Sequence, residues 1–117
     1  MVSLRNLTIK SFHEGLLKKQ FSALEVVQAF FARIKETDKK IGAYLSLREE
    51  EAAREAEAVD VSVGKGEEVG FLAGAPLAIK DNILIENSPA TAASRILENH
   101  IASYDATVIS KLKKEKA

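Results

Sequence analysis

The strongest constraint on the fold is residues 71–83, a stretch that is nearly free of charge until it reaches a lysine. Pro76 can open a strand but cannot lie in its middle, because proline lacks the backbone N–H that a β-ladder uses. The Leu-Ala-Ile run at 77–79 has no polar residue in alternation, which predicts a short strand buried on both faces. Lys80 would then lie at the carboxyl end of that strand, where open α/β sheets place their ligand crevices.

Two interpretations of Lys80 follow from this position. Burial disfavours the charged ammonium, so a lysine buried at a strand end can accept a proton and activate a serine hydroxyl. Alternatively, the side chain extends its charged end into water, steadied by the neighbouring Asp81. Most lysines are solvated, so the chemistry of the residue alone favours the second interpretation.

Helical patterns dominate the sequence before this stretch. Apolar residues recur at helical spacing after Thr8, which is the expected N-cap of a first helix. A capping box at residues 22–25 predicts the start of a second helix, which should end near residues 37–40. A second capping-box match at residues 46–49 predicts the start of a third helix.

The remaining segments predict strands and loops. Residues 41–47 are typical of a strand, although Gly42 weakens it, and residues 83–85 form a second short apolar run. Residues 60–70 are rich in glycine and charge, which predicts an exposed loop. Asp105 is the expected N-cap of a last helix. Together these patterns predict an α/β fold.

Composition restricts the function classes. The 17 basic and 17 acidic side chains cancel, so no net field attracts nucleic acid or an anionic membrane. The chain has no cysteine, which excludes a disulfide framework and thiolate metal sites. His13 lacks a second ligand at helical spacing, and the glutamates at 49–51 would point in different directions on a helix, so neither predicts a metal site. With no apolar run long enough to span a bilayer, we expect a soluble protein of one domain at most.

The stretch around Lys80 resembles the catalytic-lysine segment of the amidase signature family. The resemblance is carried by Leu-Ala-Gly at 72–74, by Pro76 and by Ala-Ile-Lys-Asp-Asn-Ile at 78–83. Thr-Ala-Ala-Ser-Arg-Ile-Leu-Glu-Asn at 91–99 and Tyr-Asp-Ala-Thr-Val at 104–108 follow at the spacing of that family. These later blocks are most similar to the A subunits of glutamyl-tRNA(Gln) amidotransferases, and the resemblance covers nearly all of the chain.

This resemblance implies a fold and a catalytic group. The fold is the N-terminal portion of the amidase signature fold, with helices packed on an incomplete mixed sheet. The family hydrolyses amides with a Ser–cis-Ser–Lys triad, of which Lys80 is the member present here. The bridging serine and the nucleophile belong to a Gly/Ser-rich block that residues 1–117 do not contain. We therefore expect residues 1–117 to be the N-terminal part of a single amidase domain, truncated before that block, and to be inactive alone.

For an amidotransferase of this kind, the resemblance also implies substrates and partners. Glutamine is hydrolysed, and its ammonia serves the ATP- and Mg²⁺-dependent conversion of glutamyl-tRNA(Gln) to glutaminyl-tRNA(Gln) in a complex with the B and C subunits. No residue of this chain is assigned to a cofactor, and tRNA would be bound through the complex. The expected location is the cytoplasm, or an organellar matrix in a eukaryote.

Two alternative functions stay open. The first is a non-catalytic, helix-rich module that docks on a partner subunit, and the second is a fragment of another amidase of this family that acts on small amides. An incomplete sheet with open apolar edges also predicts marginal stability for the isolated chain.

Overall fold

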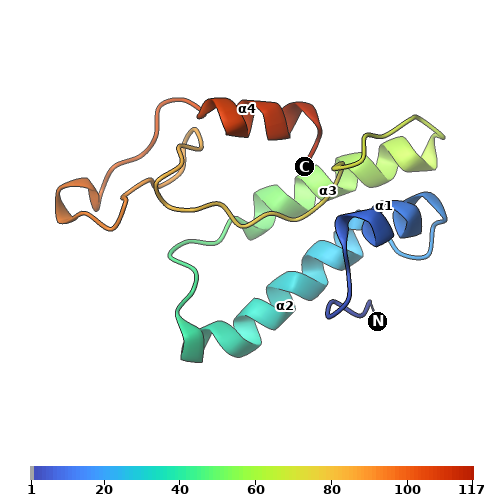
Figure 1. The fold of residues 1–117 in the computed structure, drawn as a ribbon, viewed down its shortest axis with the longest axis horizontal. Coiled ribbons are helices and arrows are strands. Elements are labelled where there is room, and N and C mark those ends of the chain that lie inside the picture. Colours follow the sequence, from blue (N-terminus) through green and yellow to red (C-terminus); the bar gives the residue numbers. More distant parts are fainter. Residues whose placement is uncertain (1) are drawn as a thin grey trace. The chain divides into compact units, whose positions relative to one another are not determined.

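The computed structural model describes residues 2–117 and divides the chain into two compact units (Figure 1). The first unit extends to Pro76 and also includes Glu115–Ala117, and the second unit is Leu77–Lys114. Within residues 2–117, no helix combines the length and the apolar character needed to cross a membrane.

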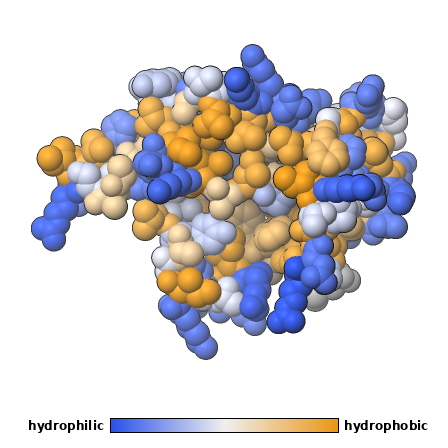
Figure 2. Space-filling model, in the orientation of Figure 1, coloured by the Kyte–Doolittle hydropathy of each residue, from blue (hydrophilic) through white to orange (hydrophobic). Residues whose placement is uncertain are grey.

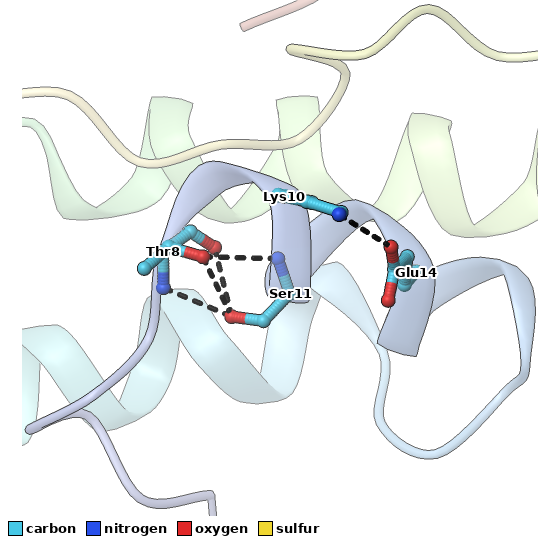
Figure 3. A network of polar contacts seen from close by, with 4 residues as sticks. All are labelled: Thr8, Lys10, Ser11 and Glu14. Atoms are coloured by element: carbon cyan, nitrogen blue, oxygen red, sulfur yellow. Dashed lines mark hydrogen bonds and ion pairs between the residues drawn. The ribbon is translucent and has the colours of Figure 1, made fainter.

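Helix α1 spans Ile9–Leu17 and begins at the predicted N-cap (Figure 3). The hydroxyl of Thr8 accepts a hydrogen bond from the Ser11 N–H at 3.1 Å, and the Ser11 hydroxyl accepts one from the Thr8 N–H at 2.9 Å. This reciprocal pair satisfies two N–H groups that the helix itself leaves unpaired. Lys10 and Glu14 form an exposed ion pair at 3.9 Å, which contributes little to stability.

Helix α2 spans Ala23–Ile41, and its predicted capping box is confirmed. The Ser22 hydroxyl accepts a hydrogen bond from the Glu25 N–H at 3.0 Å, and the Glu25 carboxylate accepts one from the Ser22 N–H at 2.8 Å. The helix ends at Ile41, just past the predicted end at residues 37–40, where Gly42 adopts the left-handed conformation with φ +66°.

Helix α3 spans Glu49–Gly64 and starts within the predicted residues 46–49, but the capping box predicted for it is wrong. Arg48 occupies the N-cap position without a side-chain capping hydrogen bond. Three glutamates in the first turn favour the helix by facing the positive end of its dipole. The helix also continues a turn into the loop predicted at 60–70.

The strand predicted at residues 41–47 is also wrong. Ile41 is the last residue of α2, and no regular element follows until α3. The Asp38 carboxylate accepts hydrogen bonds from the N–H groups of Ala43 at 2.8 Å and Tyr44 at 3.4 Å. A helix C-terminal turn therefore uses the backbone donors that a β-ladder would need.

The core of the first unit lies between α2, α3 and the irregular chain that follows α3. Helices α2 and α3 pack against each other, and α1 adds two large buried side chains. The Phe12 and Phe21 rings stack with centroids 5.9 Å apart. The buried residues of this core are Phe12, Leu16, Ala23, Val26, Val27, Ala56, Val59, Val69, Ala73 and Ala75.

Gly74 holds the irregular chain against the two helices. It has φ +74°, and a Cβ placed on it would lie 2.9 Å from the Ala23 Cβ and 3.3 Å from the Val59 Cγ1. Both the backbone conformation and the close approach require glycine. Its N–H donates a hydrogen bond to the Lys116 C=O at 2.7 Å.

The second unit contains little regular structure. It holds a short 3₁₀ helix, Arg95–Leu97, and helix α4, Thr107–Lys114. Helix α4 begins one residue later than an Asp105 N-cap predicts. An isolated antiparallel bridge between Pro89 and Ile101 is the β-pairing found within residues 2–117.

The predicted mixed sheet is not formed by the described residues. Residues 77–79 and 83–85 have no ladder hydrogen bonds, because no neighbouring segment of residues 2–117 pairs with them. The second unit also leaves many large apolar side chains exposed, and hydrophobic residues are visible among charged ones on the surface (Figure 2). These exposed residues are Leu77, Ile96, Leu97, Ile101, Tyr104 and Val108.

Candidate functional site

Lys80 lies near the start of the second unit and is exposed. Its C=O accepts a hydrogen bond from the Ile83 N–H at 3.0 Å, which closes a tight turn directly after the lysine. The expectation that residues 77–79 are buried on both faces is wrong for this structure, since Leu77 is 46% exposed. The lysine therefore follows an uncovered apolar segment.

The carboxylate of Asp81 is bound by Thr91. One carboxylate oxygen accepts a hydrogen bond from the Thr91 N–H at 3.1 Å, and the other accepts one from the Thr91 hydroxyl. The Asp81 C=O accepts a third hydrogen bond, from the Ala92 N–H at 3.1 Å. The residue next to Lys80 is thus attached through its side chain and its backbone to a segment ten positions away.

Two alanines after Thr91 adopt the left-handed conformation. Ala92 has φ +47° and Ala93 has φ +57°, a region in which residues with a Cβ are destabilised by about 1 kcal/mol or more. The Ala93 N–H donates a hydrogen bond to the Thr91 hydroxyl oxygen at 3.3 Å. Hydrogen bonds to Asp81 and Thr91 therefore hold the backbone in a conformation that alanine does not favour by itself.

These hydrogen bonds also change the acidity of Asp81. The Thr91 hydroxyl and then the Thr91 N–H lower the pKa of the Asp81 carboxyl below its ordinary value of 3.8, and desolvation opposes them only in part. Donors that hydrogen-bond the carboxylate favour its charged form. Asp81 is therefore a carboxylate at neutral pH.

This geometry tests the interpretation in which Asp81 steadies the solvated end of Lys80. The Asp81 carboxylate binds Thr91 and not Lys80, so the expected pairing of the lysine with its neighbour is wrong. Across residues 2–117, the Lys80 ammonium makes no hydrogen bond and no ion pair. The exposure of Lys80 agrees with the second interpretation, in which its charged end lies in water, and no serine of the described residues is hydrogen-bonded to it.

The sequence did not indicate the Asp81–Thr91 contact. Both residues lie in the blocks that resemble the amidase signature family, but a hydrogen bond across ten residues of irregular chain follows no periodic pattern. The one available signal was the placement of a short hydroxyl residue, Thr91, before two small residues in a segment without a predicted element.

No other part of the described chain forms a stronger candidate. A surface hollow is lined by Leu47 and Glu49–Glu51, none of which is buried. Residues 2–117 contain no group of three side chains that could hold a metal ion. The His13 ring packs 5.2 Å from the Phe71 ring, as a structural histidine would.

Comparisons with known proteins match this chain to longer ones. The family model described as Amidase matches residues 25–117. The A subunit of the glutamyl-tRNA(Gln) amidotransferase of Fusobacterium nucleatum is 46% identical over 115 residues, covering 98% of this chain and 24% of that relative. The corresponding A subunit of Alkaliphilus metalliredigens is 41% identical over 112 residues, covering 96% of this chain and 23% of that relative. The chain thus spans about a quarter of the length of these relatives.

Two solved structures share the backbone arrangement. A bacterial aryl acylamidase belonging to the amidase signature enzymes superimposes with a TM-score of 0.85 at 27% identity, over 93% of this chain and 23% of that chain. A vestigial protein complex, described as revealing the evolutionary origins of an s-triazine catabolic enzyme, gives a TM-score of 0.89 at 32% identity. That match covers 95% of this chain and 24% of the other.

Proposed function

Because the chain belongs to the amidase family, we propose that residues 1–117 are the lysine-bearing part of the A subunit of a glutamyl-tRNA(Gln) amidotransferase. The observation that carries this proposal is the identity of 41–46% with such subunits over nearly the whole chain. Residues 1–117 would correspond to the N-terminal part of one amidase domain.

In this proposal Lys80 is the general base of a Ser–cis-Ser–Lys triad. Its amine accepts a proton from a bridging serine, which in turn accepts one from the nucleophilic serine as that oxygen attacks the amide carbon of glutamine. Two features support the assignment: Lys80 has no partner among residues 2–117, and the adjacent carboxylate is bound elsewhere. Both serines would belong to a Gly/Ser-rich block, which residues 1–117 lack.

The mixed sheet also belongs to this proposal. A strand at residues 77–79 would pair with strands from the remainder of an amidase domain, which would cover Leu77 and change the surroundings of Lys80. The exposure of apolar side chains in the second unit supports this expectation. Such cover would also exclude water from the amine, as a proton acceptor at that position requires.

The cofactors and partners follow the proposed assignment. The B and C subunits would complete the enzyme, ATP and Mg²⁺ would serve the amidation of glutamyl-tRNA(Gln), and tRNA would be bound by the complex. The released ammonia would react elsewhere in the complex. This chain would therefore contribute the glutaminase half-reaction and no cofactor ligand.

The test uses a chimera. The aligned residues of the Fusobacterium nucleatum A subunit are replaced by this chain, and the chimera is assembled with the B and C subunits of that organism. We expect Lys80→Ala to abolish glutamine hydrolysis and to leave amidation from added ammonia within about threefold of the unsubstituted complex, because ammonia bypasses the triad. Lys111→Ala, which removes an exposed lysine of α4, is the matched control and should change neither activity.

Two results would contradict the proposal. Glutaminase activity that survives Lys80→Ala would exclude Lys80 as the base. A chimera that uses added ammonia but never hydrolyses glutamine would exclude the assignment to this enzyme.

The structural match to an aryl acylamidase favours a second candidate, an amidase acting on small amides. Its recognition residues would lie outside residues 1–117 in the same way. Hydrolysis of an aryl acylamide by the chimera, at a rate above that for glutamine, would favour this second candidate over the first.

A further inference from the structure

We propose that Asp81 and Thr91 form a positioning pair that fixes the backbone carrying Lys80. This inference rests on the proposed function, since it assigns the pair a task only if Lys80 is the base. Neither residue is required to touch the substrate.

The pair fixes the chain immediately after the lysine. Asp81 is joined to Lys80 by one peptide bond, and its carboxylate and C=O receive hydrogen bonds from Thr91 and Ala92. The turn between the Lys80 C=O and the Ile83 N–H restrains the same backbone from the lysine side. Hydrogen bonds therefore restrain both residues, Lys80 and Asp81, that this peptide bond joins.

A lysine that acts as a base needs this kind of support. Its side chain has four rotatable bonds and no planar group to orient it, so the position of the amine depends on where the backbone holds its Cα. A displacement of about 1 Å in a catalytic group can reduce a rate by about a hundredfold. Residues that fix the backbone next to a base can therefore control the rate without contacting the substrate.

The left-handed backbone of Ala92 and Ala93 indicates that the contact with Asp81 is kept despite an unfavourable backbone free energy. Ala92 and Ala93 are both in a region that disfavours residues with a Cβ. Their N–H groups donate to the Asp81 C=O and to the Thr91 hydroxyl oxygen, and these bonds offset the unfavourable backbone. A turn with no task besides connecting two segments would be more stable with glycine at these positions.

The experiment removes one hydroxyl in the chimeric complex described above. Thr91→Val keeps the shape of the side chain and deletes the donor, and we expect kcat for glutamine hydrolysis to fall by about tenfold or more while KM changes by less than about threefold. Thr91→Ser restores the hydroxyl and should recover kcat to within about threefold. Thr37→Val is the matched control, because the Thr37 hydroxyl donates to the Arg33 C=O within α2 and its loss should leave kcat unchanged.

A second substitution makes the test independent of folding. Rates are referred to the folded fraction measured by circular dichroism, and Asp81→Asn is compared with Thr91→Val and with the double variant. Because the two residues would act as a unit, the double variant should lose no more activity than the more affected single variant. If each substitution acted through a general loss of stability, the reductions in rate caused by Thr91→Val and Asp81→Asn would multiply in the double variant.

The outcomes separate this inference from the proposed function. If Lys80→Ala abolishes glutamine hydrolysis while Thr91→Val keeps kcat within about twofold, the positioning pair is wrong and the role of Lys80 stands. Multiplying effects in the double variant, or a rise in KM in place of a fall in kcat, would also overturn the pair. A chimera that uses added ammonia but never hydrolyses glutamine overturns both proposals.

Discussion

The carboxylate of Asp60 in α3 accepts a hydrogen bond from the N–H of Ala23, the first residue of α2, at 2.7 Å. The second oxygen of Asp60 accepts another from the Leu24 N–H at 3.0 Å. With the Ser22–Glu25 capping box, every unpaired N–H of the first turn of α2 has a partner. One side chain of α3 thus completes the start of α2 and links the two helices.

The first prediction follows from this link. Asp60→Asn replaces a charged acceptor with an amide and should lower the free energy of unfolding by about 1–2 kcal/mol, because the start of α2 loses a carboxylate that faces its dipole. Urea unfolding followed by circular dichroism measures the change. Glu57→Gln, on the exposed side of α3, is the control and should stay within about 0.5 kcal/mol. Equal effects of the two substitutions would contradict the role of Asp60.

The second prediction uses three glycines to separate backbone cost from crowding. Gly64→Ala meets open space at an ordinary φ and should raise the free energy of unfolding by about 0.5 kcal/mol. Gly66→Ala meets open space at φ +74° and should lower it by about 1 kcal/mol. Gly74→Ala has the same φ and also crowds Ala23, so it should cost about 2–4 kcal/mol.

Chemical denaturation of the three variants checks this order. If Gly74→Ala costs no more than Gly66→Ala, the close approach of the chain to α2 is not as tight as the structure has it. If Gly64→Ala is destabilising, the end of α3 is not helical in solution.

The third prediction concerns pH. The Thr91 hydrogen bonds lower the pKa of Asp81 below 3.8, so the carboxylate form is favoured in the folded chain relative to the unfolded one. The stabilisation is therefore fully present above about pH 4 and is lost as the pH falls through the lower, folded-state pKa. The ¹³C chemical shift of the Asp81 carboxyl should titrate with a midpoint below 3.8, and Thr91→Val should move that midpoint upward. A midpoint above 3.8 in the unsubstituted chain would contradict the hydrogen bonds.

The fourth prediction concerns the exposed apolar side chains of the second unit. Ile96 is 94% exposed, whereas Ile109 is 4% exposed. Ile96→Lys should reduce self-association of the isolated chain without lowering its stability, because the side chain is already in water. Ile109→Lys should unfold α4, because the substitution places an unpaired charge at a buried position of the second unit. Analytical ultracentrifugation and circular dichroism distinguish the two effects, and association unchanged by Ile96→Lys would contradict the first.

Helix starts were predictable from sequence where the signal was local. Thr8 and the Ser22–Glu25 box act within four residues, and both are confirmed. The match at residues 46–49 located the third helix, but its capping box is not formed, because a pattern of residue types does not fix the backbone and Arg48 occupies the N-cap position in place of Ser46. Residues 41–47 failed because the Asp38 side chain competes for backbone donors that the strand pattern assumes to be free.

The site was predictable only in part. Lys80 was identified from the resemblance, and its role stays a prediction. The Thr91 partner of Asp81, like the Asp60 partner of Ala23, depends on contacts between segments far apart in sequence, and periodicity and propensity describe neither. The expected mixed sheet depends on strands that residues 2–117 do not form.

The hydrogen bond between the Gly74 N–H and the Lys116 C=O joins the chain just before the second unit to the chain just after it. The polypeptide between Pro76 and Glu115 therefore departs from and returns to the same anchoring point. The two ends of this segment are therefore held together within the first unit, which meets the cost in chain entropy of closing a loop over residues 77–114.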